Sequence, residues 1–366
     1  MKLLVIHNTL AAYRVPFFIE LGKVVDLTVM FFDLEQNNKI YNDIDRTQYL
    51  RDNNVSVFSK LDKELLKNAY QGEYDFILLP ALDDFQSLKI VYSFLIHHKV
   101  PNGIWWGRWV APNIKPFSKR WIKNKLQKIS SYLALKKTDL VFAYGSKSEE
   151  YAVSCGATKP NIVRFINSTT VSESIQKINL RSEHHIATET KIILYFGRII
   201  RRKGVEILLE AFRQLPKNKF HLLICGTGED FQYLNKKYRD KDITFTGFVK
   251  PEMRSEYYQQ SDIFVIPSFF YDGTPEPWGL TVNEALQFNL PVVATTAVGA
   301  AYDLISNNVN GIVVKENDSN ALSLGILKAN SLSKTNFHIK KNDISTMVNR
   351  ITTSISEKIK KESEFE

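Results

Sequence analysis

The sequence has little cysteine and no long apolar run. Of its 366 residues two are cysteines, Cys155 and Cys225, and neither belongs to a Cys-x-x-Cys motif or to a His/Cys cluster at metal-ligand spacing. Isolated cysteines are typical of a reducing cytoplasm and argue against a structural zinc site. The N-terminal MKLLVIHN has one lysine and an apolar run too short for a signal-peptide core, so we expect a buried first strand there. No stretch approaches the roughly 18 apolar residues of a membrane-spanning helix, which predicts a soluble or peripherally bound protein.

Acidic residues are missing from one long stretch, between Asp84 and Asp139, in which eleven lysines and arginines occur. Residues 1–170 hold 23 Lys and Arg against 16 Asp and Glu, a difference of +7, whereas residues 171–366 hold 25 against 23, a difference of +2. One half of the protein therefore carries a basic surface, which predicts an anionic neighbour.

Both halves of the chain alternate strand-like and helix-like segments. The predicted strands of the first half are nearly continuous apolar runs, as expected for parallel strands that are covered on both faces. They are Leu3–His7, Leu27–Phe32, Val55–Phe58, Asp75–Pro80, Gly103–Trp106, Leu140–Tyr144 and Ile162–Ile166. Helical patterns lie between them, at Pro16–Leu21, Lys63–Tyr70 and Ser118–Lys136. This alternation predicts a parallel sheet with right-handed crossovers.

A polar stretch, Val171–Thr190, separates the halves, and we interpret it as an interdomain linker. The strands predicted after it are Ile192–Phe196, Phe220–Cys225, Ile243–Thr246, Ile263–Pro267, Val292–Thr295 and Gly311–Val314. The helix Val205–Leu215 follows the first of them, and the polar tail Asp343–Lys361 has a helical pattern. We therefore predict two Rossmann-like, doubly wound α/β domains, at 1–170 and 171–335, followed by a C-terminal segment at 336–366.

The strongest chemical signal is the stretch Glu276-Pro-Trp-Gly-Leu-Thr-Val-Asn-Glu284, which follows an apolar strand and opens a helix. Pro277 stands where a helix begins, and Gly279 lets backbone approach a ligand. A helix N-terminus binds anions through its free N–H groups and its dipole, and the two flanking carboxylates accept hydrogen bonds from ligand hydroxyls. Because Glu near a helix start is also favourable by itself, this stretch alone leaves both interpretations open.

A basic turn follows the first strand of the second half. Its cations are Arg198, Arg201, Arg202 and Lys203, at the C-terminal end of a parallel strand, where open α/β sheets bind ligands. Cations at this place match a diphosphate. Exposure to solvent in an ordinary turn would explain any one of these cations. That explanation is much weaker for this basic turn and the Glu276–Glu284 stretch together, because both are predicted at the same edge of the sheet. Neither first βα turn contains Gly-x-Gly-x-x-Gly, which disfavours a dinucleotide oxidoreductase.

These motifs make the second half resemble the donor domain of the retaining glycosyltransferases of family 4. That family has the GT-B fold, in which two Rossmann-like domains face each other across a cleft. The resemblance covers residues 191–325 and rests on Gly197-Arg198 with Lys203-Gly204, Gly226-Thr-Gly228, Phe245-Thr-Gly247-Phe248, Pro267-Ser268, Glu276-x7-Glu284, Gly299, and Asn310-Gly311 followed by Asp318.

The resemblance implies a role for each matching position. Arg198 and Lys203 would hold the donor diphosphate and stabilise it as a leaving group, Glu276 would bind sugar hydroxyls, and Glu284 would bind the ribose. The further donor contacts that it implies are at Gly279, Leu280 and Thr281 for the phosphates, at Phe248 and Val249 for the base, and at Gly226. It also implies that the anomeric configuration is retained, that neither a metal nor another cofactor is needed, and that the C-terminal helix crosses back to the first domain.

The first half resembles the family less. Tyr13-Arg14-Val-Pro16 looks like the loop and helix entry of one group of these enzymes, but His7-Asn8-Thr9 replaces the paired glycines of many members. Relatives place a histidine near Trp105-Trp106-Gly107-Arg108-Trp109, and Arg108 stands in its place, unless the alignment is shifted by a few residues. We take His7, Arg14 and Arg108 as candidates for the acceptor or sugar side of the site.

The segment Lys115–Lys137 holds eight Lys and Arg and no acid, and its apolar residues at 122, 126, 129 and 133 form a stripe of helical spacing. Such a helix binds an anionic membrane surface, so we expect it to contact the inner face of the cytoplasmic membrane. A core-packing helix with a solvated basic face explains the stripe equally well. Nucleic acid is a third alternative, but no recognition motif supports it, and we predict no nucleic-acid partner.

The sequence thus predicts a cytoplasmic, peripherally membrane-associated hexosyltransferase. It would move a hexose from a nucleoside-diphosphate sugar to a hydroxyl of a lipid-linked bacterial surface glycan, as in lipopolysaccharide or capsule synthesis. Two alternatives stay open: another GT-B enzyme such as an epimerase, which would need a further acid/base set that we do not find, and a non-catalytic subunit that binds a sugar nucleotide or a partner. Asp43-Ile-Asp45 and Asp240-Lys-Asp242 resemble metal-binding Asp-x-Asp but lie outside the predicted donor site, and we predict no metal.

Overall fold

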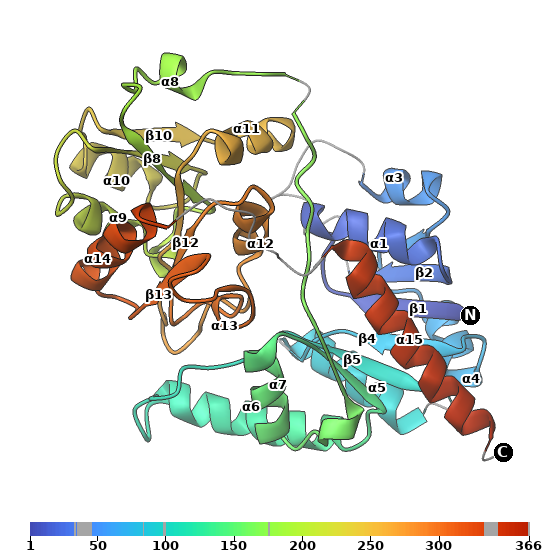
Figure 1. Ribbon diagram of the computed structural model, residues 1–366. Helices are drawn as coiled ribbons and strands as arrows, with labels where there is room; N and C mark the ends of the chain where they lie inside the picture. Colours follow the sequence, from blue (N-terminus) through green and yellow to red (C-terminus); the bar gives the residue numbers. More distant parts are fainter. Residues whose placement is uncertain are drawn as a thin grey trace. The chain divides into compact units, whose positions relative to one another are not determined.

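The computed structural model describes residues 1–32, 34, 46–82, 84–97, 100–174, 176–332 and 343–364, and they fold into two compact units (Figure 1). Unit 1 consists of Met1–Arg108, Lys115–Thr169 and Asn342–Glu366, and unit 2 consists of Trp109–Ile114 and Thr170–Lys341. Unit 2 therefore takes six residues out of the first half of the chain. This short excursion is not evident in the sequence.

Unit 1 is built on a seven-stranded sheet in the order β3-β2-β1-β4-β5-β6-β7. Every pairing is parallel, with partners such as Leu3↔Leu27 and Ile104↔Val141. The strands are β1 (Lys2–His7), β2 (Asp26–Phe31), β3 (Ser56–Phe58), β4 (Phe76–Leu79), β5 (Asn102–Trp106), β6 (Leu140–Tyr144) and β7 (Ile162–Phe165). Each strand predicted from an apolar run is confirmed, with ends that shift by at most one residue.

Helices cover both faces of this sheet. Along β1, Leu3 and Val5 belong to one buried cluster and Leu4 and Ile6 to another, because successive side chains of a strand point to opposite faces. The helices are α1 (Val15–Gly22), α3 (Arg46–Asp52), α4 (Lys63–Gln71), α5 (Phe85–His97), α6 (Lys119–Leu135), α7 (Ser146–Ser154) and α15 (Ile344–Ser363). Two-sided cover is the reason why the strands read as continuous apolar runs.

The C-terminal helix α15 belongs to unit 1. Its first turn is capped by Asp343, whose side chain accepts a hydrogen bond of 2.8 Å from the Thr346 amide, which satisfies one of the unpaired N–H groups of a helix start. Met347, Ile351 and Ile355 lie on one face of the helix, at the spacing of successive turns, and are buried in the cluster that contains α1 and β7 residues.

Unit 2 is built on a six-stranded parallel sheet in the order β10-β9-β8-β11-β12-β13. Its strands are β8 (Lys191–Phe196), β9 (Phe220–Cys225), β10 (Ile243–Gly247), β11 (Ile263–Ile266), β12 (Val292–Thr295) and β13 (Gly311–Val314). Its helices are α8 (Leu180–Glu183), α9 (Val205–Phe212), α10 (Phe231–Lys237), α11 (Arg254–Gln259), α12 (Leu280–Gln287), α13 (Ala301–Leu304) and α14 (Ser319–Asn330). The two sheets confirm the predicted class of two doubly wound α/β domains.

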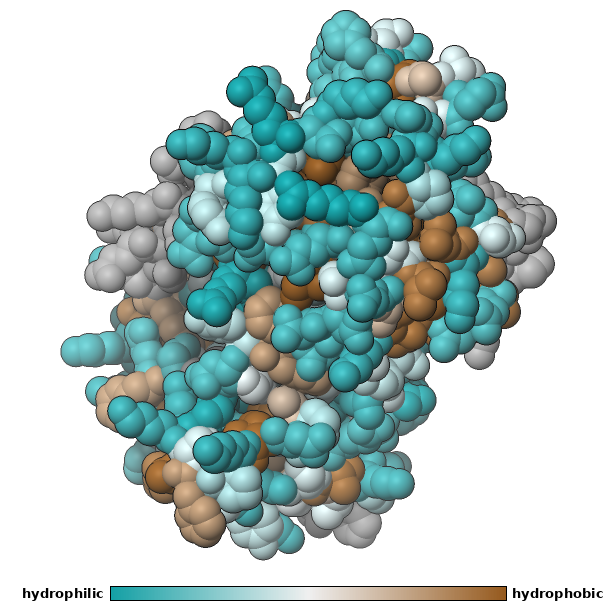
Figure 2. Space-filling model, turned by 90° about the vertical axis from the view of Figure 1, so that its left-hand side faces the viewer, coloured by the Kyte–Doolittle hydropathy of each residue, from teal (hydrophilic) through white to brown (hydrophobic). Residues whose placement is uncertain are grey.

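The surface seen in Figure 2 is predominantly hydrophilic, and hydrophobic residues appear on it in small separate groups. In the part of the chain that the structure describes, no helix is both long and apolar enough to cross a membrane.

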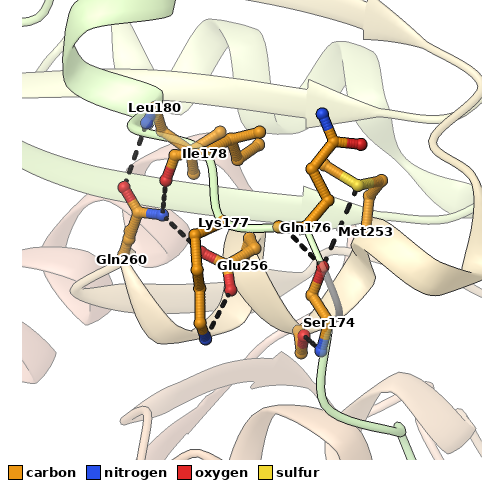
Figure 3. Close-up of polar contacts among 9 residues, drawn as sticks. Ser174, Gln176, Lys177, Ile178, Leu180, Met253, Glu256 and Gln260 are labelled. Carbon is orange, nitrogen blue, oxygen red and sulfur yellow. Dashed lines mark hydrogen bonds and ion pairs between the residues drawn. The ribbon is translucent and has the colours of Figure 1, made fainter.

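The first part of the predicted linker is bonded along α11 rather than free (Figure 3). The contacts are Ser174 N to Ser255 Oγ (2.8 Å), Lys177 Nζ to Glu256 Oε1 (2.9 Å), Gln260 Nε2 to Ile178 O (2.7 Å) and Leu180 N to Gln260 Oε1 (3.0 Å). They fix one side of α11. Arg254 and Tyr258, four positions apart and so on a common face of this helix, are left to serve the site described next.

Candidate active site

The candidate site lies where the strand order of unit 2 reverses, at the C-terminal ends of β8 and β11. Ligands bind in open α/β sheets at this kind of switch point. After β8 the chain turns at Gly197, forms a short 3-10 helix over Arg201–Lys203 and enters α9 through Gly204 in a left-handed conformation with a φ of 69°. A Cβ at Gly204 would come within 2.1 Å of the Pro267 carbonyl oxygen. Glycine therefore allows the turns after β8 and β11 to pack against each other.

A carboxylate and two cations meet at this edge. Glu276 Oε2 lies 2.5 Å from Lys203 Nζ and 3.1 Å from Arg202 Nη1, and the Glu276 residue is 8% exposed. Burial by itself raises the pKa of Glu276, but Lys203 and Arg202 outweigh burial and hold the pKa below its ordinary value. Glu276 is therefore a buried carboxylate kept charged by two cations.

The backbone around Glu276 is bonded to the loop after β12. The Glu276 amide donates to the Ala297 carbonyl at 2.9 Å, and the Gly299 amide donates to the Glu276 carbonyl at 3.1 Å. Gly279 follows in a left-handed conformation with a φ of 95° and opens α12. The stretch opens a helix, as predicted, but α12 begins at Leu280 and not at Pro277. The amides of its first turn therefore include those of Leu280 and Thr281.

Glu284 lies one turn further along α12 and is 3% exposed. Its Oε2 accepts from Tyr258 Oη at 2.6 Å and from Arg254 Nη2, and the Arg254 guanidinium stacks 4.6 Å from the centroid of the Phe196 ring. Burial raises the pKa of Glu284, and Arg254 and Tyr258 offset part of this increase, so that the pKa stays above its ordinary value. Arg254 and Glu284 form a buried pair beside the end of β8.

The ends of β8, β9 and β10 are packed tightly. Gly226 has a φ of 137°, its amide donates to the Gly247 carbonyl at 2.7 Å, and a Cβ on it would lie 1.9 Å from the Gly197 carbonyl oxygen. Just beyond β10, Phe248 is 71% exposed and Val249 is buried. Gly226 thus lets the ends of these strands approach closely, and it is bonded to the residue that precedes the exposed Phe248.

Of the three candidates of unit 1, His7 is the last residue of β1, Arg14 ends the short 3-10 helix that follows β1, and Arg108 lies two residues after β5. Burial, and after it the charge of Arg14, lowers the pKa of His7 to about 3, so His7 is neutral at physiological pH. Arg14 is 6% exposed; it donates to Asn167 Oδ1 at 3.2 Å and lies 4.6 Å from the centroid of the Trp105 ring. The described residues offer Arg14 no carboxylate partner, and its Nε has no hydrogen-bond partner.

Arg108 points toward α6. Its guanidinium donates to Gln127 Oε1, on that helix, and to the Leu82 carbonyl at 3.5 Å. Both contacts of Arg108 are with residues of unit 1. A contribution of Arg108 to the reaction stays a prediction.

Metal-ligating groups of three or more His, Cys, Asp and Glu do not occur among the residues that the structure describes. Asp240-Lys-Asp242 precedes β10, at the edge of the sheet opposite the candidate site. Asp43-Ile-Asp45 lies outside the described residues.

Sequence reasoning identified part of this arrangement. It named Glu276 and Lys203, which the structure brings into contact, and it placed Arg202, the second ion-pair partner of Glu276, in the same basic turn. The Arg198 side chain is exposed, and its carbonyl accepts from Tyr195 Oη at 2.7 Å. Arg254 and Tyr258 were missed, since a short polar helix before a strand carries no signal of a buried partner.

A family model described as "Glycosyl transferases group 1" matches residues 176–360, half of the chain. Over 273 residues, 73% of its length, the chain is 25% identical to an uncharacterized 41.2 kDa protein in the cps region of Klebsiella pneumoniae, of which 72% is covered. It is 30% identical over 171 residues, 43% of its length, to the alpha-monoglucosyldiacylglycerol synthase of Acholeplasma laidlawii, of which 39% is covered. Six other curated relatives are matched over only 27% to 50% of their own length.

Solved structures are similar over nearly the whole chain. Anabaena Alr3699/HepE in complex with UDP and glucose has a TM-score of 0.70 and 17% identity, over 98% of this chain and 100% of that one. The same protein with UDP-glucose has a TM-score of 0.69. At this identity the likeness shows the fold, which is GT-B.

Proposed function

The chain belongs to the glycosyl transferases group 1 family and is a glycosyltransferase, and from this premise we propose that it is a retaining, metal-independent hexosyltransferase. The donor is a nucleoside-diphosphate hexose, and the acceptor is a hydroxyl of a lipid-linked glycan in bacterial surface polysaccharide synthesis. The observation that carries the proposal is the buried Glu276 carboxylate, bound by Lys203 and Arg202 beside the N-terminus of α12. The likeness to HepE, which was solved with UDP-glucose, supports a sugar nucleotide as donor.

The cations suit a diphosphate leaving group. Without a donor, Lys203 and Arg202 neutralise Glu276, and the exposed Arg198 lies in the same turn. When the donor binds, its diphosphate competes for these cations, and Glu276 is left to accept hydrogen bonds from sugar hydroxyls. In the reaction the bond between the anomeric carbon and the diphosphate oxygen breaks, the acceptor oxygen bonds to that carbon, and the acceptor's proton passes to the departing diphosphate. Fixed cations stabilise the charge that builds up on the departing diphosphate.

Glu284 suits the ribose. In the part of the chain that the structure describes, Tyr258 and Arg254 both bind Oε2 of Glu284, which leaves Oε1 for a ribose hydroxyl. Phe248 and Val249 lie at the end of β10, next to Gly226, and we assign the base to this place. The phosphates are then assigned to the amides of Gly279, Leu280 and Thr281, between the ribose at Glu284 and the sugar at Glu276.

The test is a panel of UDP-, GDP- and ADP-sugars, with release of nucleoside diphosphate as the measurement. We expect wild type to hydrolyse one donor selectively, and Glu276→Ala to reduce this hydrolysis about 10- to 100-fold, since hydrogen bonds to a charged group contribute about 1.5–3 kcal/mol. Glu210→Ala is the matched control, because it removes an exposed glutamate of the same unit. If no donor is bound or cleaved, even with membrane extract as the source of acceptor, the chain is a non-catalytic member of its family.

The acceptor side is assigned to unit 1. Arg14 is a buried cation without a carboxylate partner among the described residues, and removing a charge from water without a counter-ion is costly. An acceptor with an anionic linkage to its lipid would supply that counter-ion. His7, Arg14 and Arg108 stay candidates for this side of the reaction.

The membrane surface is assigned to α6. Its apolar stripe is exposed: Ile122 by 48%, Leu126 by 63%, Ile129 by 60% and Leu133 by 54%. The alternative of a core-packing stripe is therefore wrong, and the buried residues of α6 are Ser131, Ala134 and Leu135. An exposed apolar stripe flanked by lysines fits the interface of an anionic membrane, and the relative from Acholeplasma laidlawii is by its name a synthase of a lipid. We propose that the protein works at the inner face of the cytoplasmic membrane.

Removal of two lysines from this surface tests the assignment. We expect Lys123→Gln/Lys125→Gln to weaken binding to phosphatidylglycerol vesicles roughly 10- to 30-fold, since each basic residue near an anionic surface contributes about 1 kcal/mol. The measurement is vesicle co-sedimentation at low and high salt. Lys217→Gln/Lys219→Gln, two exposed lysines of unit 2, should bind like wild type. Equal binding of wild type to neutral phosphatidylcholine vesicles would count against the assignment.

A further inference from the structure

The excursion Trp109–Ile114 lies against the loop that carries Glu276. The six residues belong to unit 2, although the chain on both sides of them belongs to unit 1. The Ala111 amide donates to the Gly273 carbonyl at 3.1 Å, and Trp109 Nε1 donates to the Pro277 carbonyl at 3.1 Å. We call these six residues the strap.

The strap holds the loop at two points. Near the start of the loop that carries Glu276, Tyr271 and Thr274 exchange both backbone hydrogen bonds. Between them, Asp272 and Gly273 have φ values of 47° and 68°, as in a tight two-residue hairpin turn. The Ala111 bond is made at the tip of this turn. The Trp109 bond is made at the far end of the loop, directly after Glu276.

The Trp109 side chain is enclosed within unit 2. It is 6% exposed and packs edge-to-face on Phe270 and on Tyr302, with ring centroids 5.5 Å and 6.1 Å away. Gly299 lies against the same carbonyl, and a Cβ on it would come within 2.2 Å of the Pro277 oxygen and 3.4 Å of Trp109 Nε1. The absence of a side chain at Gly299 therefore leaves room for the Trp109–Pro277 hydrogen bond.

This carbonyl lies between two parts of the proposed donor site. The Glu276 side chain precedes it by one residue, and Gly279, which opens α12, follows two residues later. Pro277 has no N–H of its own, so its carbonyl is its one backbone hydrogen-bonding group. Rotation of the Pro277–Trp278 peptide would move the Glu276 carboxylate relative to the first turn of α12.

We propose that Trp109 is a positioning residue of the donor site: through the Pro277 carbonyl it sets the Glu276 carboxylate for the sugar part of the donor. This inference rests on the proposed function, because Glu276 is there assigned to the sugar hydroxyls. The nucleoside diphosphate, assigned to Lys203, Glu284 and the α12 amides, is held by groups that Trp109 does not touch. Trp109 therefore acts on the sugar and not on the nucleotide.

The test uses the full chain with Trp109→Phe, which keeps an aromatic ring and removes the N–H. We expect hydrogen–deuterium exchange to become roughly tenfold faster in the peptides that cover 270–279 and 297–302, since a half-buried carbonyl has lost its donor. We expect the affinity for the sugar nucleotide chosen by the donor panel to fall roughly tenfold, and the affinity for its free nucleoside diphosphate to stay within about twofold.

Two further variants keep the test decisive. Tyr233→Phe, at an exposed position of α10, is the control and should leave both affinities and the exchange of 270–279 unchanged. Gly299→Ala, whose added Cβ would crowd the Pro277 carbonyl where Trp109 binds it, should reproduce the loss for the sugar nucleotide. Unchanged exchange in Trp109→Phe, or an equal loss for the sugar nucleotide and the diphosphate, would overturn the inference. If wild type binds no sugar nucleotide, the proposed function fails, and the exchange experiment still decides whether Trp109 orders the loop.

Discussion

We expect Lys203→Met to lower turnover of the donor about 100- to 1,000-fold, the effect of removing one fixed group that stabilises charge in a transition state. Lys203 Nζ lies 2.5 Å from Glu276 Oε2, and its side chain is 17% exposed. Water that enters the space left by Lys203 would not compensate for the lost cation, because a buried charge is stabilised mainly by its neighbours. The measurement is kcat at saturating donor, with the thermal midpoint recorded to show that the variant folds.

The same variant should change the pH profile. Burial raises the pKa of Glu276 and Lys203 is the strongest group that opposes it, so the pKa of Glu276 rises when Lys203 is lost. Residual activity should then decrease toward acid pH, where wild type still holds the carboxylate charged. Lys237→Met is the matched control, because Lys237 Nζ makes an ion pair of 2.6 Å with Glu206 on the surface. Turnover within a few-fold of wild type would remove Lys203 from the diphosphate site.

The fold was predictable because its strands are covered on both faces. A run such as Lys191–Phe196 stays apolar at every position only if both sides are buried, and the structure buries Ile192 to Phe196. The end of each such run marks the edge at which ligands bind, which is why Lys203 and Glu276, 73 residues apart, were assigned to one place.

The partners at this edge were less predictable. Whether Arg198 or Arg202 turns inward depends on the short 3-10 helix Arg201–Lys203, and a run of basic residues does not encode that turn. Arg254 meets Glu284 across 30 residues of sequence, and other residues of the same helix region bind the linker (Figure 3); the local pattern of α11 encodes neither contact. For α6 the periodicity of the stripe was visible, but not which side of the helix faces unit 1. In each case tertiary packing decides and local pattern does not.

Arg254→Leu should enlarge two pH dependences that run in opposite directions, one of stability and one of nucleotide affinity. Burial raises the pKa of Glu284 and Arg254 is the strongest group that opposes it, so the variant has a pKa raised further. A carboxyl whose pKa is raised by folding stabilises the native state at low pH, and this contribution is lost as the pH rises through the folded pKa. The free energy of unfolding should therefore fall toward alkaline pH, by up to about 3–5 kcal/mol, the cost of a buried charge without its partner. Affinity for nucleoside diphosphate, which needs the carboxylate, should instead rise over the same range.

A second substitution separates the two effects. In Arg254→Leu/Glu284→Gln the buried charge is gone, so the unfolding free energy should recover and lose its pH dependence, while nucleoside diphosphate affinity stays low at every pH. Urea titrations and isothermal titration calorimetry from about pH 5 to about pH 9 measure both quantities across the range in which a raised carboxyl titrates. Arg239→Leu, at an exposed position of unit 2, should leave both at wild-type values. Equal affinity of the double variant and wild type would mean that Glu284 and Arg254 stabilise unit 2 without touching the ribose, because the pair would then be needed for folding alone.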